Sequence, residues 1–475
     1  MFNAKIKILC FFILAFFIYG DCSKKNTDNS GPGSSTGNIE MWLTKSDQSV
    51  LLQKQTGAIS FDNNSNGFPF IDVDSSTTYQ SIDGFGFALT GGSAYVINQL
   101  NSSDKSALLN ELFGNGPNSI GVSYLRISIG ASDLNASVYS YDDMPSGQTD
   151  TTLANFSLSK DTVDVIPLLK QMLAINPNLK LLGSPWSPPV WMKDNGSSIG
   201  GSLLPQYYNV YAKYFVKYIQ AMQSNGITVN AITIQNEPQY GGNNPSMVMS
   251  ATQQADFIKN NLGPAFHTAG ITTKIIVWDH NCDNPGYPIT VLSDPAANPY
   301  IDGSAFHLYA GDISALSTVH TAFPDKNLYF TEQWTGSNET FDGNLKWHIK
   351  NVIIGSVLNW SKVALEWNLA SDANYQPHTP GGCSECKGAI TVSGGYSRNV
   401  SYYIIGQVAK FVPTGSLHIS SAQVSGLSNV AFLRPDGKKV LLVLNEGNAT
   451  GFNLRYKGRW ARISMPASSV ATFVW

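Results

Sequence analysis

The chain carries little charge and none of the short motifs that mark several large enzyme classes. Only 13% of its 475 residues are charged, with 30 basic against 33 acidic side chains, and no basic cluster is interleaved with aromatic residues. This composition argues against nucleic acid as a partner. The sequence has no HExxH, P-loop, GxSxG or dinucleotide-binding fingerprint, so it gives no indication of a zinc protease, a nucleotide hydrolase, a serine hydrolase or a bound cofactor.

Cysteine is scarce as well, with five in the whole chain. Beyond residue 22 only Cys282, Cys383 and Cys386 remain. The CxxC pair at 383 and 386 lacks the second pair that a tetrahedral zinc site needs, and its glycine-rich surroundings are typical of a loop rather than of a redox βαβ unit. We therefore expect a loop disulfide between Cys383 and Cys386, and no metal site. Cys282 has no assigned partner.

Long hydrophobic runs are absent except for one near the start. Lys5 and Lys7 precede an apolar run over residues 8–19, which is too short to span a bilayer and predicts an export signal over residues 1–22. Residues 23–40 are then a flexible polar tether. This order resembles a bacterial lipoprotein, so we expect an exported protein at the outer membrane or cell surface, attached to the membrane only through a lipid on Cys22. Ordinary secretion, with release into the periplasm or medium, is the alternative.

From about residue 80 onward, short β-branched or aromatic runs alternate with longer amphipathic stretches, as in βα units. Helical spacing is clear over residues 162–174 and 207–224. Eight such units predict a closed (β/α)8 barrel, because a doubly wound open sheet more often has fewer strands. The expected strands are 81–90, 123–129, 180–185, 231–235, 274–279, 303–309, 327–331 and 362–367.

Outside the barrel the pattern changes to alternating strands joined by tight turns, among them Pro435-Asp436-Gly437. We expect an antiparallel β-sandwich domain built from both chain ends. Its first part would be residues 41–75 and its second part 412–475, with the barrel over 76–411. An independent N-terminal cap is the alternative for the early strands.

Two of the predicted strands lead into a glutamate in an amide-rich or aromatic setting. Glu237 follows Asn236, and Glu332 precedes Trp334. A barrel presents catalytic acids at the C-terminal ends of its strands, and retaining glycosidases need two carboxylates about 5–5.5 Å apart. The pair therefore predicts a glycoside hydrolase, with Asn236 placed to bond a sugar 2-hydroxyl. Either glutamate alone could be a surface charge at a strand end.

Other strand ends supply side chains that would support such a pair. A guanidinium would keep a nucleophile ionised, a tyrosine hydroxyl would orient it, and an aspartate could accept bonds from two sugar hydroxyls. Each of these residues could instead be structural. The candidates are Arg126, Asp133, the indoles of Trp186 and Trp191 in a proline-rich loop, His307, Tyr309 and Trp367.

Several motifs in order resemble glycoside hydrolase family 30, the group of glucosylceramidases and β-1,6-glucanases. They are the segments 184–193, 235–238, 306–309, 330–333 and 366–370. The resemblance implies a retaining barrel with an attached sandwich, Glu237 as acid/base and Glu332 as nucleophile. It places Asp133, Trp191, Asn236 and Trp367 around the glycone, with Arg126, His307 and Tyr309 near the nucleophile. Glu237 should then be protonated at rest, with a raised pKa.

Two segments, 381–388 and 278–283, look more like the bacterial β-1,6-glucanase branch than the glucosylceramidases. We therefore expect double displacement on β-1,6-glucan through a glucosyl-enzyme. Glucosylceramide or another β-glucoside is the alternative substrate. An inverting hydrolase and a non-catalytic, glycan-binding surface lipoprotein are the competing functions. The second would not need both glutamates.

Overall fold

The structure is a computed structural model and describes residues 38–475. The predicted export signal, Cys22 and all but the end of the predicted tether therefore lie outside the described residues. Within residues 38–475, no helix combines the length and the apolar character that crossing a membrane requires.

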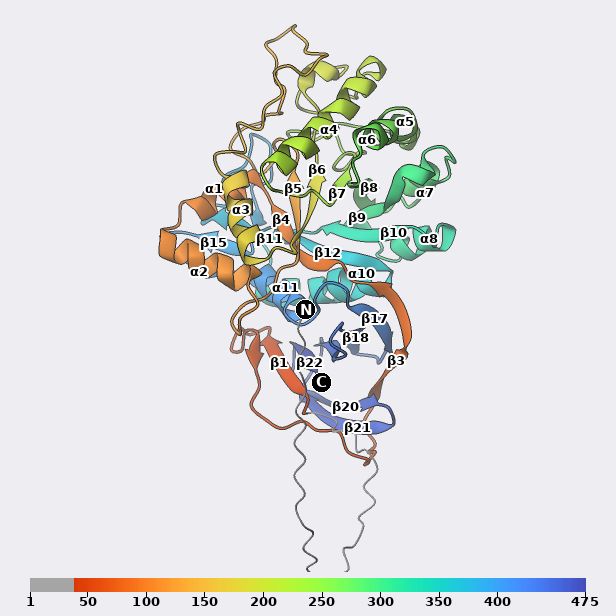
Figure 1. Cartoon of the computed structure of the whole chain (residues 1–475). Coiled ribbons are helices and arrows are strands. Elements are labelled where there is room, and N and C mark those ends of the chain that lie inside the picture. The colour runs from red at the N-terminus through yellow and green to blue at the C-terminus, as the bar shows by residue number, and fades with distance from the viewer. Residues whose placement is uncertain (1–37) are drawn as a thin grey trace, which may run out of the picture. The chain divides into compact units, whose positions relative to one another are not determined.

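Eight parallel strands close into a barrel in the order β10-β12-β4-β5-β6-β7-β8-β9, which confirms the predicted fold (Figure 1). Each strand overlaps one of the eight predicted segments. The strands are β4 (Gly84–Leu89), β5 (Tyr124–Ser128), β6 (Lys180–Ser184), β7 (Ala231–Thr233), β8 (Lys274–Cys282), β9 (Ile301–Gly311), β10 (Asn327–Glu332) and β12 (Ser361–Asn368).

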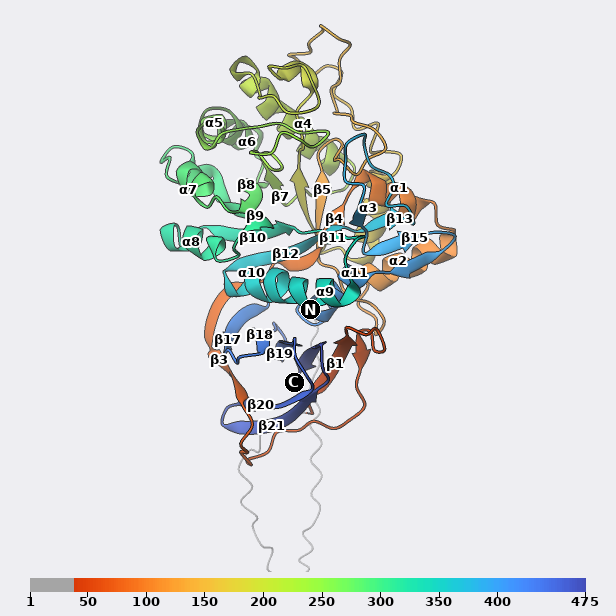
Figure 2. The ribbon, with the colours of Figure 1, turned by 180° about the vertical axis from the view of Figure 1, so that it is seen from behind.

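Helices surround the barrel, and their apolar faces are buried against its strands (Figure 2). The α-helices are α1 (Gly91–Asn98), α2 (Ser102–Phe113), α3 (Val165–Ile175), α4 (Tyr208–Ser224), α5 (Ala251–Phe257), α6 (Gly263–Ala269), α7 (Gly286–Leu292), α8 (Ala315–Ala322), α9 (Phe341–Trp347), α10 (Gly355–Leu358) and α11 (Val400–Ala409). Two π-helical segments, η3 (Ile258–Leu262) and η5 (His348–Ile354), join α5 to α6 and α9 to α10. Helices α3 and α4 match the two predicted helices.

The lower part of the barrel interior is a packed apolar layer, as the fold requires. Its side chains come from seven of the strands and are almost fully buried. They are Tyr124, Leu182, Ala231, Ile276, Ala305, Tyr329, Val363 and Leu365. Since side chains alternate along a strand, the next inward residue of each strand lies one layer closer to its C-terminal end.

A nine-stranded sheet is built from both ends of the described chain, in the order β2-β1-β22-β19-β18-β17-β3-β20-β21. Its strands are β1 (Glu40–Lys45), β2 (Gln53–Lys54), β3 (Phe70–Ser81), β17 (Leu417–Ser421), β18 (Leu427–Leu433), β19 (Lys439–Asn445), β20 (Thr450–Tyr456), β21 (Arg459–Met465) and β22 (Ser469–Val474). The alternative of an independent N-terminal cap is wrong, because β1 pairs with β22 and β3 pairs with both β17 and β20. Since β3 continues to Ser81, the sheet also extends past the expected boundary at residue 75.

Strand β19 shows why this sheet has apolar residues on both faces. Val440, Leu442 and Leu444 belong to the core shared with the barrel, whereas Leu441 and Val443 belong to the separate core within the sheet. Every second residue therefore faces the barrel. One face joins the two parts of the molecule and the other closes the sandwich.

The loop after β12 carries short strands and the predicted disulfide. Cys383 and Cys386 are bonded, which confirms that prediction, and Cys282 is free and buried. The short strands of this loop are β13 (Ala370–Asp372), β14 (Cys386–Lys387), β15 (Ile390–Val392) and β16 (Tyr396–Arg398), and a further short strand, β11 (Thr335–Gly336), follows β10. The pairing of β14 with β11 holds the disulfide loop beside the end of β10.

Candidate active site

A layer of polar side chains lies directly above the apolar layer of the barrel. On β5, β9 and β10 it begins two residues beyond Tyr124, Ala305 and Tyr329, at the next inward position. All of its members have no exposed surface. They are Arg126, Ser184, Thr233, Asp279, His307 and Thr331.

Asp279 is the centre of this layer. Its Oδ2 accepts hydrogen bonds from Arg126 (2.8 Å) and from the hydroxyls of Ser184 and Thr233 (both 2.7 Å), and its Oδ1 accepts one from Thr331 (2.7 Å). The backbone reaches this position through a positive φ of 65° and a shift in strand register. Burial raises the pKa of Asp279, but Arg126 and His307 outweigh it and hold the pKa well below its usual range. Asp279 is therefore a fixed negative charge under the site.

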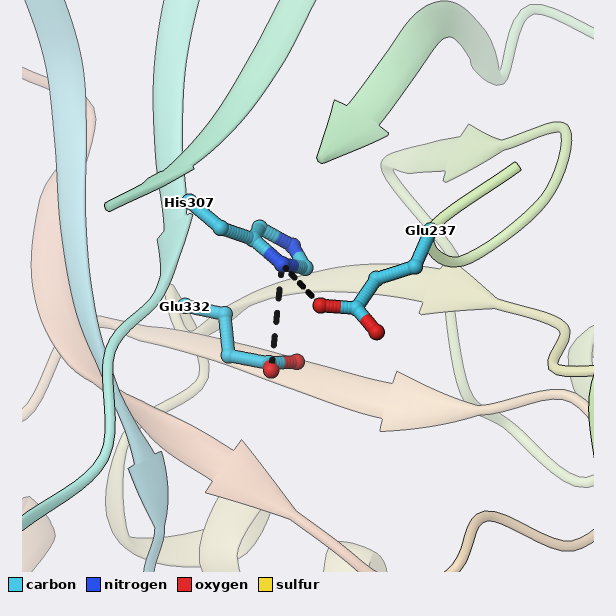
Figure 3. Close-up of side chains that lie close together, drawn as sticks. All are labelled: Glu237, His307 and Glu332. Carbon is cyan, nitrogen blue, oxygen red and sulfur yellow. Dashed lines mark hydrogen bonds and ion pairs between the residues drawn. The ribbon is translucent and has the colours of Figure 1, made fainter. Parts of the chain in front are cut away.

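The two predicted glutamates meet above this layer, and both face Nδ1 of His307 (Figure 3). That nitrogen lies 3.2 Å from Glu237 Oε1 and 3.8 Å from Glu332 Oε1. One carboxylate oxygen of each glutamate lies within 4.8 Å of the other. This spacing suits a retaining glycosidase, since inverting enzymes separate the two groups by about 6.5–9.5 Å to admit a water molecule.

Both carboxylate oxygens of Glu332 accept hydrogen bonds from residues that the sequence placed near it. Arg126 Nη1 donates to Oε2 at 2.5 Å, and the Tyr309 hydroxyl donates to Oε1 at 3.0 Å. Arg126 also donates to Asn236 Oδ1 at 2.6 Å. Because this bond occupies the oxygen of Asn236, its NH2 group is the end available to donate to a sugar hydroxyl.

The charged groups of the site shift the pKa values of His307 and the two glutamates, and the pKa of Glu237 moves in the direction opposite to the one expected. Burial lowers the pKa of His307, but Glu332, Asp279 and Glu237 outweigh burial and raise it to about 9, so the ring is cationic at neutral pH. Burial raises the pKa of Glu237, but the hydrogen bond and charge of His307 bring it below the usual value. Burial raises the pKa of Glu332 above its usual value, despite His307 and Arg126. The raised pKa expected for Glu237 is therefore wrong, because His307 lowers it.

Glu237, His307 and Glu332 are also close enough together to surround a metal ion. Both ring nitrogens of His307 face carboxylates, however, Nδ1 toward Glu237 and Nε2 toward Asp279, and the surrounding carboxylates raise the pKa of the ring to about 9. The arrangement suits an imidazolium between two carboxylates better than a metal centre.

A cavity of about 460 Å³ opens over the glutamates and is lined by most of the predicted residues. Asp133, Asn236, Glu237, Tyr309, Glu332 and Trp367 all line it, together with both disulfide cysteines. Arg126 and His307 lie beneath it, in the buried polar layer. Another cavity of about 410 Å³ lies where strands begin, near Lys180 and Lys274, and has no carboxylate pair.

The placement of Trp191 around the glycone is wrong. Its indole N–H donates to the Asp142 carbonyl at 2.9 Å and its ring packs on Tyr207, and it does not line the cavity. Trp186, the other indole of the same loop, lines the cavity instead. It stacks over the Arg126 guanidinium at 4.8 Å and lies 5.4 Å from the Trp367 ring.

Sequence reasoning also missed several residues of the site. Asp279 is the last residue of a predicted strand, close to where the two glutamates follow theirs, and this position was the available signal. Of the remaining cavity residues, His280 and Asn281 lie on β8 and the others lie in loops, and only His280, directly after Asp279, gave a signal in the sequence. These remaining residues are Tyr240, Asn243, His280, Asn281 and Trp334.

Comparison with protein-family models accounts for nearly all of the described chain. Residues 82–412 match the glycosyl hydrolase family 30 TIM-barrel domain, and residues 415–473 match the glycosyl hydrolase family 30 beta sandwich domain.

Individual relatives cover most of the chain too. An endo-1,6-beta-D-glucanase of Neurospora crassa is 39% identical over 79% of this chain and 81% of its own length. The lysosomal acid glucosylceramidase of Mus musculus is 29% identical over 84% of this chain and 81% of its own. The solved structure of an endo-beta1,6-glucanase superposes with a TM-score of 0.85 at 33% identity, covering 92% of this chain and 99% of that one.

Proposed function

Because the chain belongs to glycosyl hydrolase family 30, we propose that it hydrolyses β-1,6-linked glucan with retention of configuration. The observation that carries the proposal is the carboxylate pair of Glu237 and Glu332, whose oxygens approach within 4.8 Å at the C-terminal ends of barrel strands. The choice of linkage is supported by similarity to two proteins named as endo-1,6-glucanases, one by sequence and one by structure.

The mechanism is double displacement. Glu332 attacks the anomeric carbon while Glu237 gives its proton to the departing glycosidic oxygen, which leaves a glucosyl ester on Glu332. Glu237 then takes a proton from a water molecule, whose oxygen attacks the same carbon and frees the sugar and the Glu332 carboxylate. The pair must hold one proton to begin. A glycosidic oxygen that accepts a hydrogen bond from Glu237 favours that proton on Glu237, whereas the positive charge of His307 acts against it.

Glucosylceramide is the second candidate substrate, since the mouse lysosomal acid glucosylceramidase is 29% identical to this chain. A non-catalytic glycan-binding role is the remaining candidate. It would not need both glutamates, and it would not need Arg126 and Tyr309 on the Glu332 oxygens.

Export is a separate proposal and rests on sequence alone. Lys5, Lys7 and the apolar run over 8–19 support an export signal, and Cys22 supports a lipid anchor. Mass spectrometry of the mature N-terminus should find a diacylated cysteine at position 22. Cleavage elsewhere without lipid would indicate ordinary secretion instead.

Product analysis tests the activity and the nucleophile together. Purified wild type, Glu332→Gln and the exposed control Glu339→Gln are incubated with β-1,6-glucan, β-1,3-glucan and glucosylceramide, and products are identified by chromatography and mass spectrometry. We expect release from β-1,6-glucan by wild type and by the control, and a loss of at least about 10³-fold in Glu332→Gln.

Each other outcome has its own meaning. Glucose release only from the lipid would replace the proposed substrate with glucosylceramide. Activity that persists in Glu332→Gln would remove Glu332 as nucleophile. Binding of glucan by titration calorimetry without any hydrolysis would favour the non-catalytic role, and an inverted anomer first seen by proton NMR would refute double displacement.

A further inference from the structure

The disulfide loop contacts Asp133 on both its main chain and its side chain. The Thr379 N–H donates to the Asp133 carbonyl at 2.8 Å, and the Cys383 N–H donates to the carboxylate Oδ2 at 3.3 Å. The approach at Gly382 is so close that a Cβ there would lie 2.4 Å from the Asp133 carbonyl oxygen. The loop therefore fits against the one carboxylate of the cavity that belongs to neither catalytic role.

The other end of the loop pairs with β11, just beyond the strand that carries Glu332. Cys386 and Lys387 pair with Thr335 and Gly336, three to four residues beyond that glutamate. The Ser337 N–H also donates to the Glu385 carbonyl at 2.9 Å. The loop thus spans from the Asp133 side of the cavity to the nucleophile side.

The disulfide itself is part of the cavity wall. Cys386 is 4% exposed and packs in one apolar cluster with Leu134, Trp186 and Trp367, and Cys383 packs against the same cluster. Leu134 is the neighbour of Asp133 in the chain. The crosslink closes the segment between the N–H that contacts Asp133 and the strand pair beside Glu332, so it removes backbone freedom where a shift would break the Asp133 contact.

The charge of the Asp133 carboxylate depends on the hydrogen bond from the Cys383 N–H. Burial, and then the charge of Glu332, raise its pKa to about 7, while the Cys383 N–H acts in the opposite direction. A buried carboxylate that loses a donor becomes a poorer acceptor for sugar hydroxyls near neutral pH, because its charged form is less favoured.

We propose that the Cys383–Cys386 disulfide is a positioning element for Asp133, and that it sets how tightly the sugar on the glycone side of the cleaved bond is held. The proposal rests on the proposed function, since it assigns Asp133 to the binding of that sugar. The disulfide touches none of the reacting atoms in this account and acts only through Asp133.

The test compares KM and kcat for β-1,6-linked gluco-oligosaccharides. The double variant Cys383→Ser/Cys386→Ser is measured against wild type and against Ser384→Ala, an exposed change in the same loop. We expect KM to rise roughly tenfold in the double variant, which corresponds to one weakened charged hydrogen bond, with a much smaller fall in kcat. Ser384→Ala should match wild type. Unchanged KM, or a loss confined to kcat, would overturn the proposal.

Asp133→Asn supplies the decisive comparison. If the disulfide acts through Asp133, its removal should raise KM no further in the Asp133→Asn background, because the two changes break one interaction. Effects on KM that multiply would refute the proposal.

If the serine variant does not fold, KM of wild type is measured before and after reduction of the disulfide, with the reduction verified by mass. A rise in KM on reduction is again expected. If wild type cleaves some other β-glucoside instead, the proposed substrate fails, and the same comparison on that glucoside still decides the role of the disulfide.

Discussion

His307 is the side chain on which the charges of the site converge. It contacts Glu237 through Nδ1 and Asp279 through Nε2, both at 3.2 Å, which fixes the ring, and its positive charge is favoured by Glu332 first and then by these two carboxylates. With a pKa of about 9 it carries a positive charge throughout the range in which the glutamates titrate. That charge favours the ionised forms of Glu237 and Glu332, and we expect its removal to change the pH dependence of hydrolysis.

We predict that His307→Gln shifts the profile of kcat/KM against pH upward. The profile should be bell-shaped, because the reactive pair holds exactly one proton. A cation beside a carboxylate lowers its pKa, so replacing His307 by a neutral amide raises the pKa values of the pair and moves both limbs to higher pH, on the order of one unit. Initial rates between pH 3 and 9 measure this, each normalised to its own maximum. A flat profile, or a shift to lower pH, would contradict the assignment.

Strand alternation accounts for the buried site residues that the sequence could foresee, but not for Asp279. Arg126 and His307 are inward-facing two residues beyond Tyr124 and Ala305, a pattern visible in the sequence. Asp279 departs from the pattern, because positive φ values at Trp278 and Asp279 shift the register of β8. A tryptophan rarely adopts that conformation and an aspartate adopts it only in isolated positions, so local preference predicts a regular strand there rather than a bulge.

Gly86 offers a test of barrel closure at the level of one strand. It pairs with Tyr124 across β4 and β5, and a Cβ at this position would lie 1.9 Å from the Tyr124 carbonyl oxygen. We predict that Gly86→Ala lowers the free energy of unfolding by about 3 kcal/mol, because backbone must move to admit the methyl group. Gly67→Ala, with no atom within 4 Å of the added Cβ, should change it by less than about 0.5 kcal/mol. Urea unfolding followed by circular dichroism measures both free energies, and equal values for the two variants would contradict the prediction.

At the scale of the whole molecule, the sheet and the barrel share one core. Phe432 and Val440 of the sheet belong to the same apolar cluster as Phe85 and Phe87 of the barrel, so neither part buries its surface alone. The sequence did indicate a sandwich made from both chain ends. It could not indicate which residues join that sandwich to the barrel, because the polar contacts between them join positions far apart in the chain, such as Gln407 with Thr44, 363 residues away, and with Thr472, 65 residues away.

Gln407 of α11 makes two of these contacts, so its replacement tests how the sheet is joined to the barrel. Its side chain has no exposed surface, its Nε2 donates to Thr44 of β1 at 2.7 Å, and its Oε1 accepts from Thr472 of β22 at 2.7 Å. Gln407→Leu keeps the volume but removes both hydrogen bonds, so we predict a loss of about 1–3 kcal/mol in the free energy of unfolding. Gln220→Leu, an exposed change within α4, should cost far less.

The number of steps in the unfolding transition provides a second prediction about the contact between the sheet and the barrel. Because the barrel and sheet share a core, wild type should unfold in one step, with the loss of hydrolysis and the loss of circular dichroism at the same urea concentration. Gln407→Leu should move both signals together to lower urea. If activity instead survives a first transition that removes part of the dichroism, the sheet is an independently unfolding appendage, and its contribution to the active site is nil. If both signals fall together, the strands from the two chain ends stabilise the barrel that holds Glu237 and Glu332.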